Sequence, residues 1–130
     1  LITKGHLELV HEATGNLPKE IVFAGGASKS PLWCQILADV LNLPVRVPVV
    51  KEATALGAAI LAGYAVGLYS DIAETAGRLV AWDKTFTPNP ANHEVYEGMY
   101  GNWRQVYVRQ LQLADEGLTR HMWAAPGLSK

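Results

Sequence analysis

The sequence lacks most of the features that would place it outside ordinary globular domains. Only one of its 130 residues is a cysteine, Cys34, so no internal disulfide can form. Charged residues make up 18% of the chain, the formal net charge is −1, and the lysines and arginines are scattered. Such a surface offers no basic field to nucleic acid or to anionic lipid. We therefore expect no nucleic-acid partner and no membrane partner.

Long hydrophobic runs and targeting signals are also scarce. The most apolar stretch, Ala53–Leu68, is short for a bilayer crossing and is interrupted by Gly57, Gly63 and Tyr64, so it predicts a buried helix. No secretory signal opens the chain, which together with the single cysteine favours a cytoplasmic protein. The chain starts at Leu1, directly in an amphipathic segment, and we expect it to be a fragment of a longer protein.

What the chain does contain is an alternation of helical patterns and short apolar strands. Two apolar runs, Glu20–Ala24 and Val45–Val47, flank a helical pattern that Ser28 or Ser30 can cap. The order strand, helix, strand predicts a parallel pair, and the first strand suits burial on both faces. Further helices are expected over residues 2–13, 52–66, 71–79 and 92–116, and irregular structure over residues 83–90. The predicted fold class is α/β, rich in helix, with a short parallel β pair.

The first strand runs into a glycine turn, Gly25-Gly26-Ala27-Ser28-Lys29-Ser30, that precedes a helix. Glycines after a parallel strand let the backbone approach a ligand, and the N–H groups that open the helix point toward it. A bound nucleotide and a tight turn without a ligand both fit this pattern. Lys29-Ser30 does not complete a Walker A loop, because Ser28 and Phe23 stand where that motif needs glycine.

A second signal is the small-residue run Glu52–Ala59 at the start of a helix that is apolar on nearly all sides. Such a helix is expected to be buried. Glu52 complements the helix dipole and Thr54 can satisfy free N–H groups at the helix start. No second carboxylate lies at a spacing suited to shared acid–base work, so the run is interpreted as a packing device.

The remaining chemically distinctive residues are best interpreted as packing residues. The four histidines do not form a metal-binding pattern with Cys34, which is expected to act as a small buried hydrophobe. Four aromatic residues of the last helix are spaced for core or interface packing, namely Tyr96, Tyr100, Trp103 and Tyr107. We expect no metal ligands in this chain.

The two signals and the residues between them resemble the C-terminal domain of FGGY carbohydrate kinases. The matching positions are Gly25-Gly26-Ala27, Ser30, Trp33-Cys34-Gln35, Ala38-Asp39, Pro44-Val45, Pro48 and Glu52 to Ala59, then Leu61-Ala62-Gly63 and Val66-Gly67. The resemblance implies part of an actin-like, ribonuclease-H-like ATPase domain. Residues 1–130 would be the C-terminal portion of the nucleotide-binding domain, and the N-terminal sugar-binding domain would be absent.

The resemblance also implies which residues meet the nucleotide. Gly25 and Gly26 would bring N–H groups near the phosphates and ribose, and Ser30 would lie at the adenine or ribose edge. Ala27 belongs to the same nucleotide-binding turn and stands where many relatives have a third glycine. The cofactors would be ATP and Mg²⁺. No catalytic residue is expected here, because the aspartate that accepts the hydroxyl proton would lie upstream.

The implied activity is transfer of the γ-phosphoryl group of ATP to a sugar-like hydroxyl by an intact parent enzyme. The partners would be ATP, a small sugar-like substrate and the protein's own N-terminal domain. The sequence leaves the oligomeric state open, with a homodimer as one alternative. The isolated chain is expected to be inactive, because it supplies one side of the cleft.

Two segments narrow the resemblance within the family, Thr87–His93 with Tyr96, and Met122–Leu128. They favour one member over the gluconate, xylulose, ribulose and glycerol kinases, which share the central motifs. An alternative of another class is a non-catalytic interaction module that docks through its aromatic last helix. An upstream sequence with or without a proton-accepting aspartate would discriminate between these hypotheses.

Overall fold

A computed structural model describes residues 1–119 of the chain. The elements in chain order are α1 (Ile2–Thr14), β1 (Ile21–Val22), the 3₁₀ helix η1 (Gly26–Lys29), α2 (Pro31–Leu41), β2 (Val45–Pro48), α3 (Ala53–Ala65), α4 (Ile72–Leu79), β3 (Trp82–Phe86) and α5 (Pro90–Asp115). Residues 1–96 form one compact unit, and a second unit begins at Glu97, inside α5. Each unit is therefore described separately.

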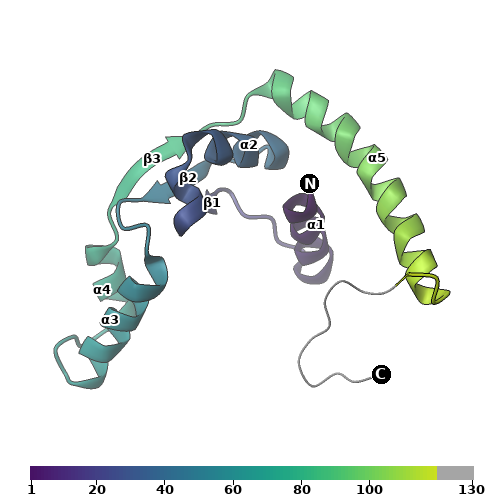
Figure 1. Ribbon diagram of the computed structural model, residues 1–130. Coiled ribbons are helices and arrows are strands. Elements are labelled where there is room, and N and C mark those ends of the chain that lie inside the picture. The colour runs from purple at the N-terminus through teal and green to yellow at the C-terminus, as the bar shows by residue number, and fades with distance from the viewer. Residues whose placement is uncertain (120–130) are drawn as a thin grey trace. The chain divides into compact units, whose positions relative to one another are not determined.

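The first unit contains a three-stranded sheet in the order β1-β2-β3 (Figure 1). β1 pairs with β2 in parallel, with Ile21 opposite Val45, and β2 pairs with β3 in antiparallel, with Val45 opposite Phe86. The parallel pair joined by a helix confirms the predicted α/β class. Val45 lies at the centre of the sheet and is fully buried.

The third strand corrects the expectation that residues 83–90 are irregular. Most of that expectation rested on Pro88 and Pro90, but both prolines follow the end of β3 and so cost it no hydrogen bond. Pairing with β2 fixes the strand, and the Arg46 guanidinium lies 3.8 Å from the centre of the Trp82 ring across the pair. Only Phe86 of this strand is buried, which is why periodicity did not reveal it.

The hydrophobic core lies between α2 and the sheet. Its buried members are Cys34, Ala38, Val45, Val47 and Phe86. α2 reaches this position because apolar residues recur at helical spacing along one face, and Figure 1 shows it beside the strands. Cys34 is fully buried, which confirms its predicted role as a small hydrophobe.

The ends of α2 follow from two cap residues. The Ser30 hydroxyl accepts a hydrogen bond from the Trp33 N–H at 3.3 Å, and Pro31 occupies the first turn, where a missing N–H costs nothing. Asn42 ends the helix with φ of 53°, a left-handed conformation that asparagine tolerates better than most residues. Of the two serines proposed as caps, the structure selects Ser30.

Two predictions of burial are wrong for this chain. β1 was expected to be buried on both faces, but Val22 is 55% exposed. α3 was expected to be a buried helix, yet only Ile60 and Gly63 are buried and Leu61 is 56% exposed. Burial on all sides requires neighbours on all sides, and the helix with which α3 packs here is α4 (Figure 1).

A buried carboxylate joins the end of α2 to the start of α5. Asp39 Oδ1 accepts hydrogen bonds from the Gln35 amide and the Asn89 N–H, and Asp39 Oδ2 accepts one from the Asn92 amide, each at 2.8 Å. The Asp39 carbonyl lies 2.9 Å from His93 Nδ1. The segment that precedes α5 is therefore fixed by one side chain that is 2% exposed.

These contacts also control the ionisation of Asp39. Burial favours the neutral acid, but the hydrogen bonds from Asn89, Asn92 and Gln35 outweigh burial, with help from His93. The net effect lowers the pKa of Asp39 below its ordinary value. The connection between α2 and the start of α5 therefore depends on a carboxylate that is ionised at neutral pH.

Within the second unit, the part of α5 after Glu97 carries an aromatic stack. The ring centre of Trp103 lies 5.7 Å from that of Tyr100 and 5.1 Å from that of Tyr107, with nearly parallel planes. Three of the four aromatic residues in the series thus pack against one another along the helix, with Tyr100 buried and Tyr107 exposed. The segment Met122–Leu128, used for the resemblance, lies outside the described residues.

Candidate functional site

The glycine turn begins where β1 ends, and its backbone requires glycine at one position. Gly25 has φ of 90° and ψ of −174°, a conformation that side chains with a Cβ rarely adopt. Its N–H donates to the Lys51 carbonyl at 2.7 Å, and its own carbonyl accepts bonds from the Ser28 N–H at 3.1 Å and the Ser28 hydroxyl at 2.7 Å. The turn is thus held on both sides by the protein.

Gly26 differs from Gly25, because its backbone conformation does not require glycine. Its φ is not positive, and a Cβ added there would meet no atom of the chain within 4 Å. The N–H groups of Gly26 and Ala27 open η1, where a helix leaves its first donors without intrahelical acceptors. The Gly25 N–H donates to the Lys51 carbonyl and is not available to a ligand, which leaves the N–H groups of Gly26 and Ala27 as the candidate donors of the turn.

The inner side of the turn is anchored to the core. Ser28 is buried, and its carbonyl accepts a hydrogen bond from Cys34 Sγ at 3.4 Å. Burial raises the pKa of the Cys34 thiol above its ordinary value, against the smaller opposing influence of Lys51 and Lys84. Cys34 therefore stays a neutral thiol that supports the turn, and it has no nucleophilic role there.

The outer side of the turn carries an ion pair between η1 and the residue that precedes α3. Lys29 Nζ lies 2.8 Å from Glu52 Oε1, and both side chains are exposed. The hydrogen bond from Lys29 lowers the pKa of Glu52, so Glu52 is ionised and unsuited to act as a general acid. The predicted cap at the start of α3 is wrong, since no side chain caps this helix.

Two residues that the sequence did not single out complete the surroundings of the turn. Lys51 Nζ donates to the Pro48 carbonyl at 2.7 Å and to Asp83 Oδ2 at 2.6 Å. Asp83 lies on β3, so its approach to Lys51 depends on the register of a strand that the sequence analysis missed. No local pattern links residues 32 positions apart, and only the sheet topology could have revealed the pair.

Next to the turn lies an apolar cavity of 230 Å³. Its lining includes Val22 and Ala24 of the first strand segment, Ala53 and Ile60 of α3, and Trp82 of β3. No charged side chain lines it, so it suits apolar groups and not phosphate. The polar, open surface of the turn and this apolar cavity are chemically distinct neighbours.

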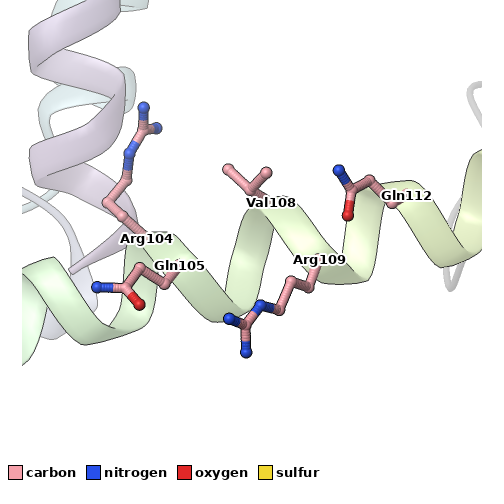
Figure 2. Close-up of a pocket in the computed structure, with 5 residues that line it drawn as sticks. All are labelled: Arg104, Gln105, Val108, Arg109 and Gln112. Atoms are coloured by element: carbon pink, nitrogen blue, oxygen red, sulfur yellow. The ribbon is translucent and has the colours of Figure 1, made fainter.

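A second surface hollow, of 410 Å³, lies on α5 in the second unit (Figure 2). Its lining consists of Arg104, Gln105, Val108, Arg109 and Gln112. Figure 2 shows the guanidinium groups of Arg104 and Arg109 pointing to opposite sides of the helix. They do not converge on one anion, so this hollow is a weaker candidate site than the glycine turn.

Within residues 1–119, no group of three or more histidine, cysteine, aspartate or glutamate side chains is placed to hold a metal ion. None of the helices in this part of the chain combines the length and apolar character that crossing a membrane requires.

Comparisons with known proteins match this architecture. The family model for the C-terminal domain of the FGGY family of carbohydrate kinases matches residues 1–66. An autoinducer-2 kinase from Klebsiella pneumoniae subsp. pneumoniae is 52% identical over 130 residues, which cover 100% of this chain and 24% of that protein. An autoinducer-2 kinase from Escherichia coli strain K12 is 51% identical over 128 residues, 98% of this chain and 24% of that protein.

A solved structure extends the match to three dimensions. The crystal structure of xylulose kinase from Rhodospirillum rubrum has a TM-score of 0.66 and 27% identity, covering 86% of this chain and 22% of that protein. The fold is therefore part of an actin-like, ribonuclease-H-like ATPase domain, as the resemblance implied. The chain spans 24% of the length of the curated relatives that it matches. With a family model matching 66 of its 130 residues, the chain belongs to the FGGY family of carbohydrate kinases.

Proposed function

We propose that residues 1–130 are the C-terminal portion of the nucleotide-binding domain of an ATP-dependent carbohydrate kinase. The observation that carries this proposal is the glycine turn, which follows a parallel strand and is fixed from inside by Lys51 and Ser28. Its outer surface is open, and the backbone of Gly26 can be approached without a side chain in the way. This combination suits close contact with a phosphate or ribose.

In this proposal four residues of the turn contribute to nucleotide binding in different ways. Gly26 and Ala27 direct N–H groups to the nucleotide, and Gly25 supplies the conformation that makes this direction possible. Ser30 lies at the ribose or adenine edge and also caps α2. Mg²⁺ would arrive on the phosphates of ATP, where it neutralises charge during transfer.

The acceptor follows from the relatives. Proteins 51–52% identical over this chain are named autoinducer-2 kinase, so we propose the autoinducer-2 precursor, dihydroxypentanedione, as the substrate. Phosphorylation would trap this signal in the cytoplasm, because a charged product does not readily recross a bilayer. The alternative within the family is another sugar kinase, and a xylulose kinase is among the structural neighbours.

Catalysis in this proposal needs more than the present chain. The residue that accepts the hydroxyl proton and most of the sugar site would belong to an N-terminal domain that closes over ATP. The chain by itself would bind ATP weakly and transfer no phosphoryl group. Its contribution is the placement of the nucleotide.

Gly26→Val in the intact kinase tests the proposal. The branched side chain would occupy the open space above the turn, so the KM for ATP should rise about tenfold or more while the fold survives. Gly77→Val is the matched control, because Gly77 on α4 also has no positive φ and no atom within 4 Å of an added Cβ. Coupled ADP-release kinetics with dihydroxypentanedione would measure both variants.

The proposal fails if a well-folded Gly26→Val enzyme keeps the wild-type KM for ATP and the wild-type turnover. It also fails if Gly77→Val weakens ATP use as much as Gly26→Val, because the effect would then belong to any bulky substitution. A panel with xylulose, gluconate, ribulose and glycerol as acceptors separates the substrate from the kinase assignment. Activity on one of these sugars alone would replace dihydroxypentanedione and leave the ATP-binding role standing.

A further inference from the structure

We propose that Lys51 and Asp83 form a positioning pair that sets the glycine turn for the nucleotide. This inference rests on the proposed function, since it assigns the pair to the ATP site of the kinase. Neither residue belongs to the motifs that carry the family resemblance. Their role is inferred from the contacts that Lys51 makes through both its main chain and its side chain.

The main-chain carbonyl of Lys51 forms hydrogen bonds with the glycine turn and with the start of α3. Its carbonyl oxygen accepts the N–H of Gly25 at 2.7 Å and the N–H of Ala53, at the start of α3, at 3.0 Å. A single carbonyl thus links the first residue of the glycine turn to the helix that follows β2. Any displacement of this carbonyl moves Gly25, and with it the donors of Gly26 and Ala27 that follow.

The side chain of Lys51 fixes where that carbonyl lies. Its ammonium group donates to the Pro48 carbonyl at 2.7 Å and to Asp83 Oδ2 at 2.6 Å, and the side chain is 17% exposed. Pro48 is the last residue of β2 and Asp83 is on β3, so both acceptors belong to the paired strands. The loop between β2 and α3 is therefore tied to the sheet at Lys51.

The energetics favour a positioning role over a stabilising one. Asp83 is 56% exposed, and ion pairs with such a partner contribute little to folding because water screens them. The N–H groups of the turn, however, must be placed accurately, because misplacing substrate-binding groups by about an ångström can lower the rate about a hundredfold. Loss of the pair should therefore change ATP use more than it changes stability.

The same sheet provides a matched control pair. Arg46 Nη1 lies 2.8 Å from Glu20 Oε1, a separation similar to that between Lys51 and Asp83. Arg46 is on β2, as Pro48 is, and Glu20 precedes β1. Within residues 1–119, the side chains of Glu20 and Arg46 bond to each other and form no hydrogen bond with residues 25–30. Glu20→Gln removes an ion pair from the sheet without touching the turn.

The experiment measures steady-state kinetics of the intact kinase with ATP and the acceptor varied separately. Lys51→Met should raise the KM for ATP about threefold to tenfold, with the KM for the acceptor changed less than about twofold. Asp83→Asn should have a smaller effect in the same direction. Lys51→Arg, which keeps the charge and donors, should recover most of the loss, and Glu20→Gln should match the wild type.

Combining the two substitutions tests whether they act as a pair. If Lys51 acts through Asp83, the double variant should be no worse than Lys51→Met alone, because the second change removes an interaction already lost. Thermal melting of every variant gives the accompanying change in stability. If Lys51→Met does not fold, the comparison is made with Asp83→Asn and Lys51→Arg: the first should raise the KM for ATP, and the second should leave it close to the wild-type value.

Several outcomes would overturn the inference. Equal rises in both KM values, or a fall in melting temperature with an unchanged KM for ATP, would assign the pair a structural role only. An effect of Glu20→Gln as large as that of Asp83→Asn would do the same. A wild-type kinase without ATP-dependent turnover would instead contradict the proposed function, so the two failures are distinguishable.

Discussion

Two regions of the first unit look equally apolar in sequence but differ in the structure. In the region of α2 and the sheet, Cys34, Ala38 and Val45 are fully buried. In the region of α3 and α4, Leu61 is 56% exposed and Val66 is 81% exposed. The difference lies in the neighbours: α2 has a sheet under its apolar face, whereas α3 is apolar on nearly all sides and packs with α4.

This contrast shows what an apolar pattern can and cannot establish. A one-sided apolar stripe, such as that of α2, predicts which face of the helix packs, and a single neighbouring element can cover it. An all-round apolar helix predicts neighbours on every side, and such neighbours can come from parts of a protein far away in sequence. The glycine turn joins the two regions, since Lys29 on η1 pairs with Glu52 before α3.

The largest expected effect compares one residue from each region. Phe86→Ala removes a ring that is 8% exposed and should lower the free energy of unfolding by about 3 kcal/mol or more. Leu61→Ala removes a side chain that is 56% exposed and should cost less than about 0.5 kcal/mol. Urea unfolding of the 130-residue chain, followed by circular dichroism, measures both. Equal losses would show that α3 is covered in solution.

Repeating this pair of substitutions in the intact kinase sharpens the comparison. If the proposed parent covers α3, Leu61→Ala should there cost about 2 kcal/mol or more, the usual range for a buried leucine. Phe86→Ala should cost a similar amount in both proteins, because its core lies within this chain. A Leu61→Ala variant that remains neutral in the kinase would mean that the exposure of α3 is not a consequence of missing neighbours.

The next largest effect concerns Asp39, which stabilises the packed region through charge and not through apolar contact. Asp39→Asn would place an amide N–H₂ against at least one of three donors, from Gln35, Asn89 and Asn92. The loss should be about 1–3 kcal/mol at pH 7, the cost of an unsatisfied buried polar group. Asp39→Ala is the companion variant, and thermal melting compares them with the wild type.

The pH dependence of this effect has a defined sign. The folded state lowers the pKa of Asp39, so its contribution is complete above the unfolded value, about 3.9. That contribution is lost as the pH falls from there through the lowered folded pKa. The stability difference between wild type and Asp39→Asn should therefore be constant from pH 7 to 5 and shrink below about pH 4. A difference that grows on acidification would contradict the assignment.

The sequence predicted the local elements well because their causes are local. The cap at Ser30 and the end of α2 at Asn42 follow from neighbouring residues. The burial of Cys34 follows from the apolar stripe of α2, and the parallel pair follows from the order strand, helix, strand. β3 was missed because its pairing with β2 is non-local and four of its five residues are exposed. A strand without a buried face carries no alternating pattern to detect.

The candidate site was predictable in part for the same reason. Adjacent glycines after a strand marked the turn, and the family pattern implied Gly25 and Gly26 as residues near the nucleotide. The partner of the Gly25 N–H, the Lys51 carbonyl, could not be inferred, because a backbone acceptor 26 positions away leaves no trace in residue identity. Lys51 and Asp83 were missed because their contact depends on the β2–β3 register.

The smallest expected effect belongs to Ser30, the last residue of the glycine turn and the N-cap of α2. Its hydroxyl accepts the Trp33 N–H at 3.3 Å, so Ser30→Ala should lower stability by about 0.5–1 kcal/mol, the usual cost of losing a helix cap. The KM for ATP should change by less than about fivefold, because one neutral hydrogen bond contributes about 1 kcal/mol.

Ser30→Asn separates the two roles of this residue. Asparagine also caps helices well, so melting curves of Ser30→Asn should return to the wild-type midpoint while those of Ser30→Ala stay below it. If capping is the main role, ATP kinetics of the intact kinase should be nearly normal in both variants. A large rise in the KM for ATP in Ser30→Ala, at unchanged stability, would assign the hydroxyl to the nucleotide. The turn would then extend its ligand contacts to the first residue of the packed region, and the boundary between the two regions would lie inside the site.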